Sequence, residues 1–223
     1  MKLSKEVIEV LKNFSVINNS IAISELGCIK TISQAGNVLG IYTLKDFEFP
    51  VPFAIWDLSM FLSVVSLFDL SCTDFDFKEK WVIIKSNSNK IKYSYTDPKL
   101  IRSVNTIKPS EVYKKFDGFN CNIHIDQEDI KRIRKASNIM DLNQLYIKAS
   151  DECLVTLKDS EGASANTFDL KVEDFSAPGE ITVNVENLEI INGSYKINIS
   201  DNKVIKFSNI DMDLFYFITA KVV

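Results

Sequence analysis

The two halves of this 223-residue chain carry the same order of helix and strand patterns, and this repeat constrains the fold more than any other feature. When Leu3 is placed on Ile125, identical or similar residues coincide along the stretch that follows. The coinciding pairs are Glu6 with Glu128, Ile8 with Ile130, Leu11 with Ile133, Lys12 with Arg134, Ser15 with Ser137 and Ile17 with Ile139. Because a chain of this length can build two small cores, the sequence predicts two similar domains, at residues 1–108 and 109–223.

Helices are predicted at matching places in the two halves. Ser4–Ile17 and Asp126–Ile139 place apolar residues on one face at helical spacing, and Ser4 is a good N-cap. A second helical stretch, Leu58 to about Phe68, is apolar except for a narrow polar stripe. That stripe consists of Ser59, Ser63 and Ser66. A short helical piece near Val185–Ile190 takes the corresponding place in the second half.

Strand patterns fill the remainder of each half, since short apolar or alternating runs are bounded by turn residues. The predicted strands are Ile21–Ile23, Cys28–Ile32, Val38–Leu44, Trp81–Lys85, Lys90–Tyr95, Leu145–Ala149, Cys153–Lys158, Thr167–Val172, Tyr195–Ile199, Val204–Ser208 and Phe215–Val223. The polar, proline-containing stretch Asp97–Asp117 suits an extended connector between the halves. The expected fold class is α+β, with two helices packed on antiparallel sheet in each domain.

Several functional classes lack their usual sequence signals. No apolar run reaches the roughly 20 residues needed to cross a bilayer, and the N-terminus has no secretory pattern, so we expect a cytoplasmic protein without membrane contact. The chain contains neither of the glycine-rich phosphate-binding motifs GxGxxG and GxxxxGK(S/T). Its cysteines form no CxxC pair, and His124 is the single histidine. We therefore expect no metal and no cofactor.

Paired carboxylates leave one enzymatic alternative open. Asp74 with Asp76, and Asp211 with Asp213, each alternate along a strand pattern, which puts both carboxylates on one face. A two-metal nuclease needs acidic ligands that converge on shared ions. The aromatic neighbours of these residues instead favour the end of a half-buried strand, with the carboxylates on its solvent-exposed face.

Basic residues concentrate on the helix of the second half, although the formal net charge of the chain is −4. Lys131, Arg132 and Lys135 lie opposite the apolar pair Ile130 and Ile133 on a helical wheel. On the first helix, Lys5 and Lys12 share the exposed side with Glu9. These basic residues fit either a solvated helix face or a face that contacts phosphates.

The connector carries apolar residues within a polar segment that should run over the surface. They include Leu100, Ile101, Val104, Ile107 and Val112. They either attach the connector to the domains or line a pocket for a partner, for which Ile101, Val104 and Ile107 are the candidates.

Particular residue runs resemble the sliding clamps, or polymerase processivity factors, of T-even-type bacteriophages. These runs are Met1–Lys5, Leu11–Phe14 with Ile17–Asn18, and Ile55–Leu58 with Phe61–Leu62 and Ser66–Leu67. The second half resembles these clamps only in its layout.

The resemblance implies a closed ring of three subunits, each with two DNA-clamp domains, whose helices surround double-stranded DNA. It further implies a protein without catalytic activity that is loaded by an ATP-dependent clamp loader and binds the C-terminal tail of the polymerase. The site of action would be the cytoplasm of an infected bacterial host. Lys5, Lys12, Lys131, Arg132 and Lys135 are then expected to meet phosphates without reading bases. The rival hypotheses are a metal-dependent nuclease and a monomeric protein-binding module.

Overall fold

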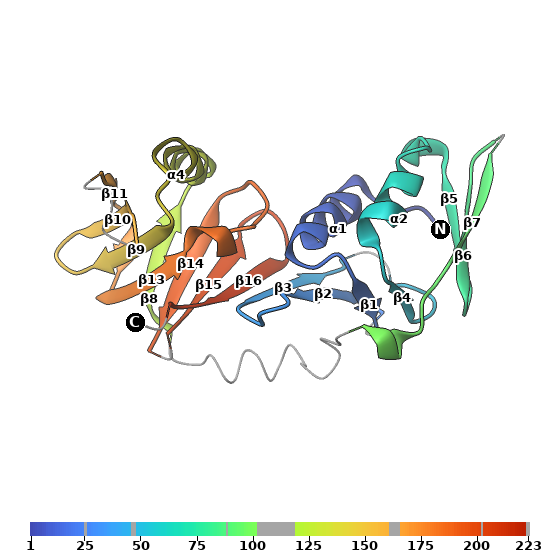
Figure 1. The fold of residues 1–223 in the computed structure, drawn as a ribbon, viewed down its shortest axis with the longest axis horizontal. Helices are drawn as coiled ribbons and strands as arrows, with labels where there is room; N and C mark the ends of the chain where they lie inside the picture. Colours follow the sequence, from blue (N-terminus) through green and yellow to red (C-terminus); the bar gives the residue numbers. More distant parts are fainter. Residues whose placement is uncertain are drawn as a thin grey trace. The chain divides into compact units, whose positions relative to one another are not determined.

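The structure is a computed structural model that describes residues 1–24, 26–45, 48–87, 89–101, 119–160, 166–201 and 203–221. The contacts divide the chain into two units. The first unit comprises Met1–Gln34 and Gly40–Lys108, and the second comprises Ala35–Leu39 and Pro109–Val223. Each unit combines helix with antiparallel sheet (Figure 1).

Two helices of the first unit begin at side-chain caps. Helix α1 spans Lys5–Ile17, and the Ser4 hydroxyl accepts a hydrogen bond from the Val7 N–H at 3.1 Å. Helix α2 spans Leu58–Val65, and the Asp57 carboxylate accepts from the Met60 N–H at 2.8 Å. Such caps satisfy N–H groups that have no partner within the helix. The two helices pack together through apolar faces.

The first unit contains two short antiparallel sheets and a further pair of neighbouring strands. Strand β1 (Ile21–Ile23) pairs with β4 (Phe53–Ile55), and β2 (Cys28–Ile32) neighbours β3 (Val38–Thr43). A further sheet has the order β5-β6-β7, from strands Asp74–Phe77, Trp81–Lys85 and Lys90–Ser94. The rings of Phe49, Phe53, Phe75 and Phe77 form a buried cluster beside these strands. Single 3₁₀ turns occur at Leu70–Cys72 and Pro98–Leu100.

Among its described residues, the second unit places one α-helix beside two antiparallel groups of strands (Figure 1). Helix α4 spans Gln127–Met140, with Asp126 as N-cap and Asp141 in the left-handed region at its end. One sheet has the order β11-β10-β9-β13, from Phe168–Val172, Cys153–Lys158, Gln144–Ala149 and Gly179–Asn184. The other group has the order β12-β8-β14-β15-β16, from Phe175–Ser176, Phe119–Ile125, Tyr195–Ser200, Val204–Asn209 and Leu214–Thr219.

The helices at Ser4–Ile17 and Asp126–Ile139 were predicted to within a residue or two, and α2 is shorter than expected. The helical piece predicted near Val185–Ile190 is wrong in extent, because only Val185–Asn187 forms a 3₁₀ turn. The carbonyls that follow this turn accept hydrogen bonds from Arg134 rather than from a continuing helix. Strands β4, β8, β12 and β13 were not predicted.

Candidate nucleic-acid interface and partner cavity

Helix α4 sorts its side chains into a buried and an exposed face. Ile130, Ile133 and Ser137 are buried, and the Ser137 hydroxyl donates to the Leu142 carbonyl at 2.6 Å. Lys131, Arg132 and Lys135 are exposed, as the helical wheel predicted. Ile139, which the repeat placed on the apolar face, is 71% exposed at the end of the helix. The structure therefore brings three cations together on one solvent-facing stripe.

Two of these cations are engaged by carboxylates of the first helical turn. Lys131 Nζ lies 2.8 Å from Glu128 Oε1, and Arg132 Nη1 lies 3.1 Å from Asp129 Oδ1. Partial burial, with a smaller contribution from Asp126, raises the pKa of the Asp129 carboxyl. In the part of the chain that is described, no ion pair engages Lys135. In both pairs the carboxylate precedes the cation by three residues, a spacing that brings side chains together on a helix.

Arg134 plays a different part from its basic neighbours. Its guanidinium donates to Asn192 Oδ1 at 2.8 Å, to the Leu188 carbonyl at 2.9 Å and to the Ile190 carbonyl. These bonds join α4 to the segment after the 3₁₀ turn of the second unit. Arg134 is therefore a structural residue, and it does not belong to the exposed stripe.

The helices of the first unit present weaker charge. Lys5, Glu9 and Lys12 are exposed on α1, so an acidic residue separates the two lysines. The exposed serines of α2 bond locally: Ser63 donates to the Ser59 carbonyl at 2.8 Å, and Ser66 donates to the Ser63 carbonyl at 2.7 Å. The serine stripe of α2 is consequently polar and uncharged, while Met60 of the same helix is an exposed apolar residue.

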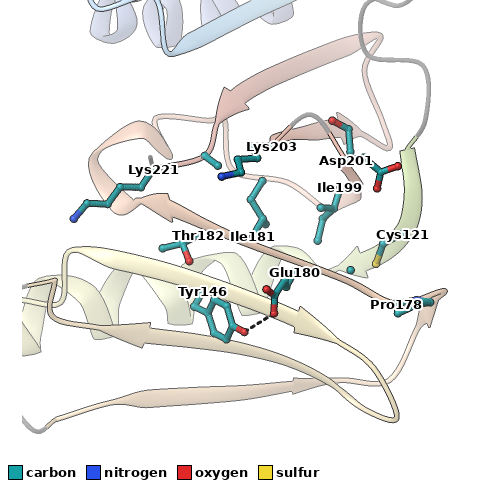
Figure 2. A pocket seen from close by; sticks show the side chains of 13 residues that line it. Cys121, Tyr146, Pro178, Glu180, Ile181, Thr182, Ile199, Asp201, Lys203 and Lys221 are labelled. Atoms are coloured by element: carbon teal, nitrogen blue, oxygen red, sulfur yellow. Dashed lines mark hydrogen bonds between the residues drawn. The ribbon is translucent and has the colours of Figure 1, made fainter. Parts of the chain in front are cut away.

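A cavity of about 400 Å³ lies within the second unit (Figure 2). Cys121, Ile181 and Ile199 provide apolar wall, while Glu180, Asp201, Lys203 and Lys221 bring charge to it. The Lys221 N–H donates to the Thr182 carbonyl at 2.8 Å, and the Ala220 N–H donates to the Lys203 carbonyl at 2.7 Å. The chain near its C-terminus is thus tied to the cavity wall by backbone hydrogen bonds.

Local geometry shapes this wall. A Cβ at Gly179 would lie 2.7 Å from the Cβ of Cys121, so a larger residue cannot fit without a shift. Glu180 Oε2 accepts a hydrogen bond from the Tyr146 hydroxyl at 3.0 Å (Figure 2). Burial raises the pKa of the Cys121 thiol, which keeps it protonated. Local sequence patterns did not predict this cavity, because its walls come from strands far apart in the chain.

The candidate connector residues are only partly described. Ile101 is 5% exposed, so its side chain is already packed in the isolated chain. Val104 and Ile107 lie outside the described residues. Their role in partner binding stays a prediction.

The acidic residues considered for a nuclease lie on exposed or half-exposed positions. Asp74 and Asp76 occupy the outward face of β5, and Asp76 Oδ1 lies 2.9 Å from Lys78 Nζ. Within the described ranges, no group of three or more His, Cys, Asp or Glu residues could hold a metal ion. The described helices include none that could cross a membrane.

Comparisons with known proteins test the resemblance seen in the sequence. No family model matches the chain. A curated sliding clamp of Vibrio phage KVP40 is 29% identical, over 96% of this chain and 97% of the relative. The sliding clamp of Escherichia phage RB69 is 26% identical, over 88% of this chain and 86% of its own. The resemblance to phage sliding clamps is confirmed.

Solved structures agree at the level of the fold. The PCNA of A. fulgidus, in its complex with the C-terminal region of FEN-1, superposes with a TM-score of 0.72 at 13% identity. The match covers 98% of this chain and 96% of that chain. The predicted fold class, α+β with helices on antiparallel sheet in a DNA-clamp architecture, is therefore confirmed.

Proposed function

We propose that this protein is a phage sliding clamp that encloses duplex DNA and tethers the replicative DNA polymerase. The observation that carries the proposal is the similarity to phage sliding clamps along almost the whole chain. The exposed cations of α4 fit this role, because lysine and arginine meet phosphates without reading sequence. A ring holds DNA topologically, so a few weak contacts suffice.

The proposed assembly is a homotrimeric ring closed head to tail. In the sheet β5-β6-β7, the β5 edge is covered by the N-terminus, since Met1 and Phe75 exchange backbone hydrogen bonds of 2.7 and 2.9 Å. In the sheet β11-β10-β9-β13, the β13 edge receives the Lys221 N–H. The opposite edges, β7 and β11, have no pairing strand among the described residues.

Open strand edges favour pairing with another chain. Half-exposed apolar residues lie on both edges, Ile91 and Tyr93 on β7 and Phe168 and Leu170 on β11. Because the two edges belong to different units, their pairing is heterologous, and such a contact closes into a ring when its rotation permits.

Partner proteins would act on the outside of this assembly. The C-terminal tail of the polymerase is proposed to bind near the connector, with Ile101, Val104 and Ile107 as apolar lining. The cavity beside Cys121 offers additional apolar wall and charged groups for such a tail. An ATP-dependent loader is proposed to open the ring in the cytoplasm of the infected host, while the clamp itself performs no catalysis and needs no cofactor.

Processive DNA synthesis tests this function. The replicative polymerase of the phage, supplied with its loader, should copy a primed circular template in long products only when the clamp is present. Linearising the template should release clamps that have been loaded, because they slide off the ends. Short products with and without the protein, together with metal-dependent DNA cleavage by the protein alone, would support the nuclease alternative.

A further inference from the structure

Two acidic residues, Glu128 and Asp129, accompany the cations of α4. Glu128 precedes Lys131, Arg132 and Lys135 by three, four and seven residues, so it lies on the same stripe of the helix. Its side chain is 67% exposed, and it holds Lys131 in an ion pair. Asp129 is 22% exposed and holds Arg132 in the same way.

These ion pairs contribute little to folding. Pairs between exposed side chains typically stabilise a protein by under about 1 kcal/mol. They nevertheless change what the helix offers to a phosphate, because Lys131 and Arg132 must leave a carboxylate before they can neutralise an external anion. The remaining carboxylate then lies beside the phosphate and repels it.

We propose that Glu128 and Asp129 attenuate the contact of α4 with DNA, so that Lys135 makes the main phosphate contact and the other two cations contribute weakly. The inference rests on the proposed function, in which α4 faces the duplex. Its benefit is mobility, because a clamp must move along DNA and strong phosphate contacts would hold it in place. This attenuation differs from a general effect of net charge, since it depends on which cation each carboxylate engages.

Charge-neutralising variants test the attenuation directly. The doubly substituted protein Glu128→Gln, Asp129→Asn should bind a fluorescent 30-base-pair duplex more tightly than the unaltered protein. The logarithm of the affinity falls linearly with the logarithm of the salt concentration, and each phosphate contact steepens this slope by about 0.9. Two released cations should therefore make the gain in affinity about 10-fold larger at 50 mM than at 200 mM salt. A matched control is Glu79→Gln with Asp151→Asn, which removes two exposed carboxylates from turns of the chain.

Single cation variants separate the pairs from general charge. Lys135→Gln should weaken binding by about 3-fold more at 50 mM than at 200 mM salt, and Lys131→Gln should have a smaller effect. In the Glu128→Gln background, Lys131→Gln should become as costly as Lys135→Gln. This change of order supports an intrahelical attenuator, because a general charge effect would leave the order unaltered.

Two outcomes overturn the inference. One is that the Glu128→Gln, Asp129→Asn protein binds the duplex no more tightly than the unaltered protein, whether or not the unaltered protein binds measurably. The other is an equal gain in the control with Glu79 and Asp151. If the double variant shows no gain while charge reversal of all three cations still lowers processivity, the attenuation alone is wrong. If processivity is also unaffected by that reversal, α4 does not face DNA and the proposed interface is wrong as well.

Discussion

At the residue scale, Arg134 shows how a basic residue on a charged helix can serve the fold alone. Its guanidinium bonds two backbone carbonyls and the Asn192 side chain at the end of the second unit's 3₁₀ segment. Hydrogen bonds from a charged group typically contribute about 1.5–3 kcal/mol each when the acceptors would otherwise be unsatisfied.

We therefore expect Arg134→Met to lower the free energy of unfolding by about 2 kcal/mol. Arg132→Met is the matched control, since it removes an exposed ion pair and should cost under about 1 kcal/mol. Urea unfolding followed by circular dichroism measures both. Equal losses in the two variants would show that the carbonyl contacts of Arg134 add nothing to stability.

The four cysteines should differ in reactivity because they differ in burial. Cys121 and Cys153 are buried, whereas Cys72 is exposed and Cys28 half-exposed. Burial raises the pKa of Cys153 from 9.0 to about 11 and also raises that of Cys121. Because the thiolate is the reactive form, both buried thiols remain protonated and slow at pH 8.

A thiol reagent at pH 8 should therefore modify Cys72 and Cys28 quickly in the folded protein, and all four cysteines in denaturant. The unfolded Cys153 loses its proton before the folded one does, so stability should fall as the pH rises from 9.0 towards about 11. Rapid modification of Cys153 in the native protein, located by mass spectrometry, would contradict this assignment.

At the scale of elements, α4 should carry the electrostatic contact with DNA. Charge reversal of Lys131, Arg132 and Lys135 to Glu is expected to reduce clamp loading or processivity, more strongly at low than at physiological salt, because phosphate contacts contribute most to binding at low salt. Exposed charges contribute little to folding, so the melting temperature and the oligomeric state should hardly change. Unaltered processivity at both salt concentrations would place these residues on an outer, solvated face.

The connector provides a second prediction at this scale. Val104→Asp and Ile107→Asp should weaken binding of a polymerase tail peptide by about 1–3 kcal/mol, because a few apolar anchors carry most of the energy of such contacts. Titration calorimetry with the peptide measures the loss. Ile181→Asp, at the cavity, offers the comparison: a loss there with none at the connector would move the docking site to the cavity.

At the scale of the whole molecule, the decisive quantity is mass. Light scattering should give about three times 25.3 kDa for a closed trimer. Substitution of Leu170 by Asp on the β11 edge should lower the mass towards that of one chain, because it places a charge on a half-exposed apolar residue of an edge that would pair. A stable dimer of the unaltered protein would contradict the heterologous ring.

Much of this molecule can be predicted from local sequence. Helices α1, α2 and α4 follow from apolar spacing together with the caps Ser4, Asp57 and Asp126, all of which act within a few residues of the chain. The exposed stripe of Lys131, Arg132 and Lys135 follows from the same periodicity, because position along a helix determines the face. The resemblance to phage clamps also required only the order of residues.

Other features depend on the tertiary structure. Strand β4 is buried at all three positions and follows Pro52, so it shows neither alternation nor a clear start. The cavity joins Cys121, Gly179, Ile199 and Lys221, which lie far apart in the sequence and meet only through the pairing of β8, β14 and neighbouring strands. Local spacing thus determined which faces are apolar or charged, whereas the long-range pairing of strands decided what those faces enclose and which edges remain open.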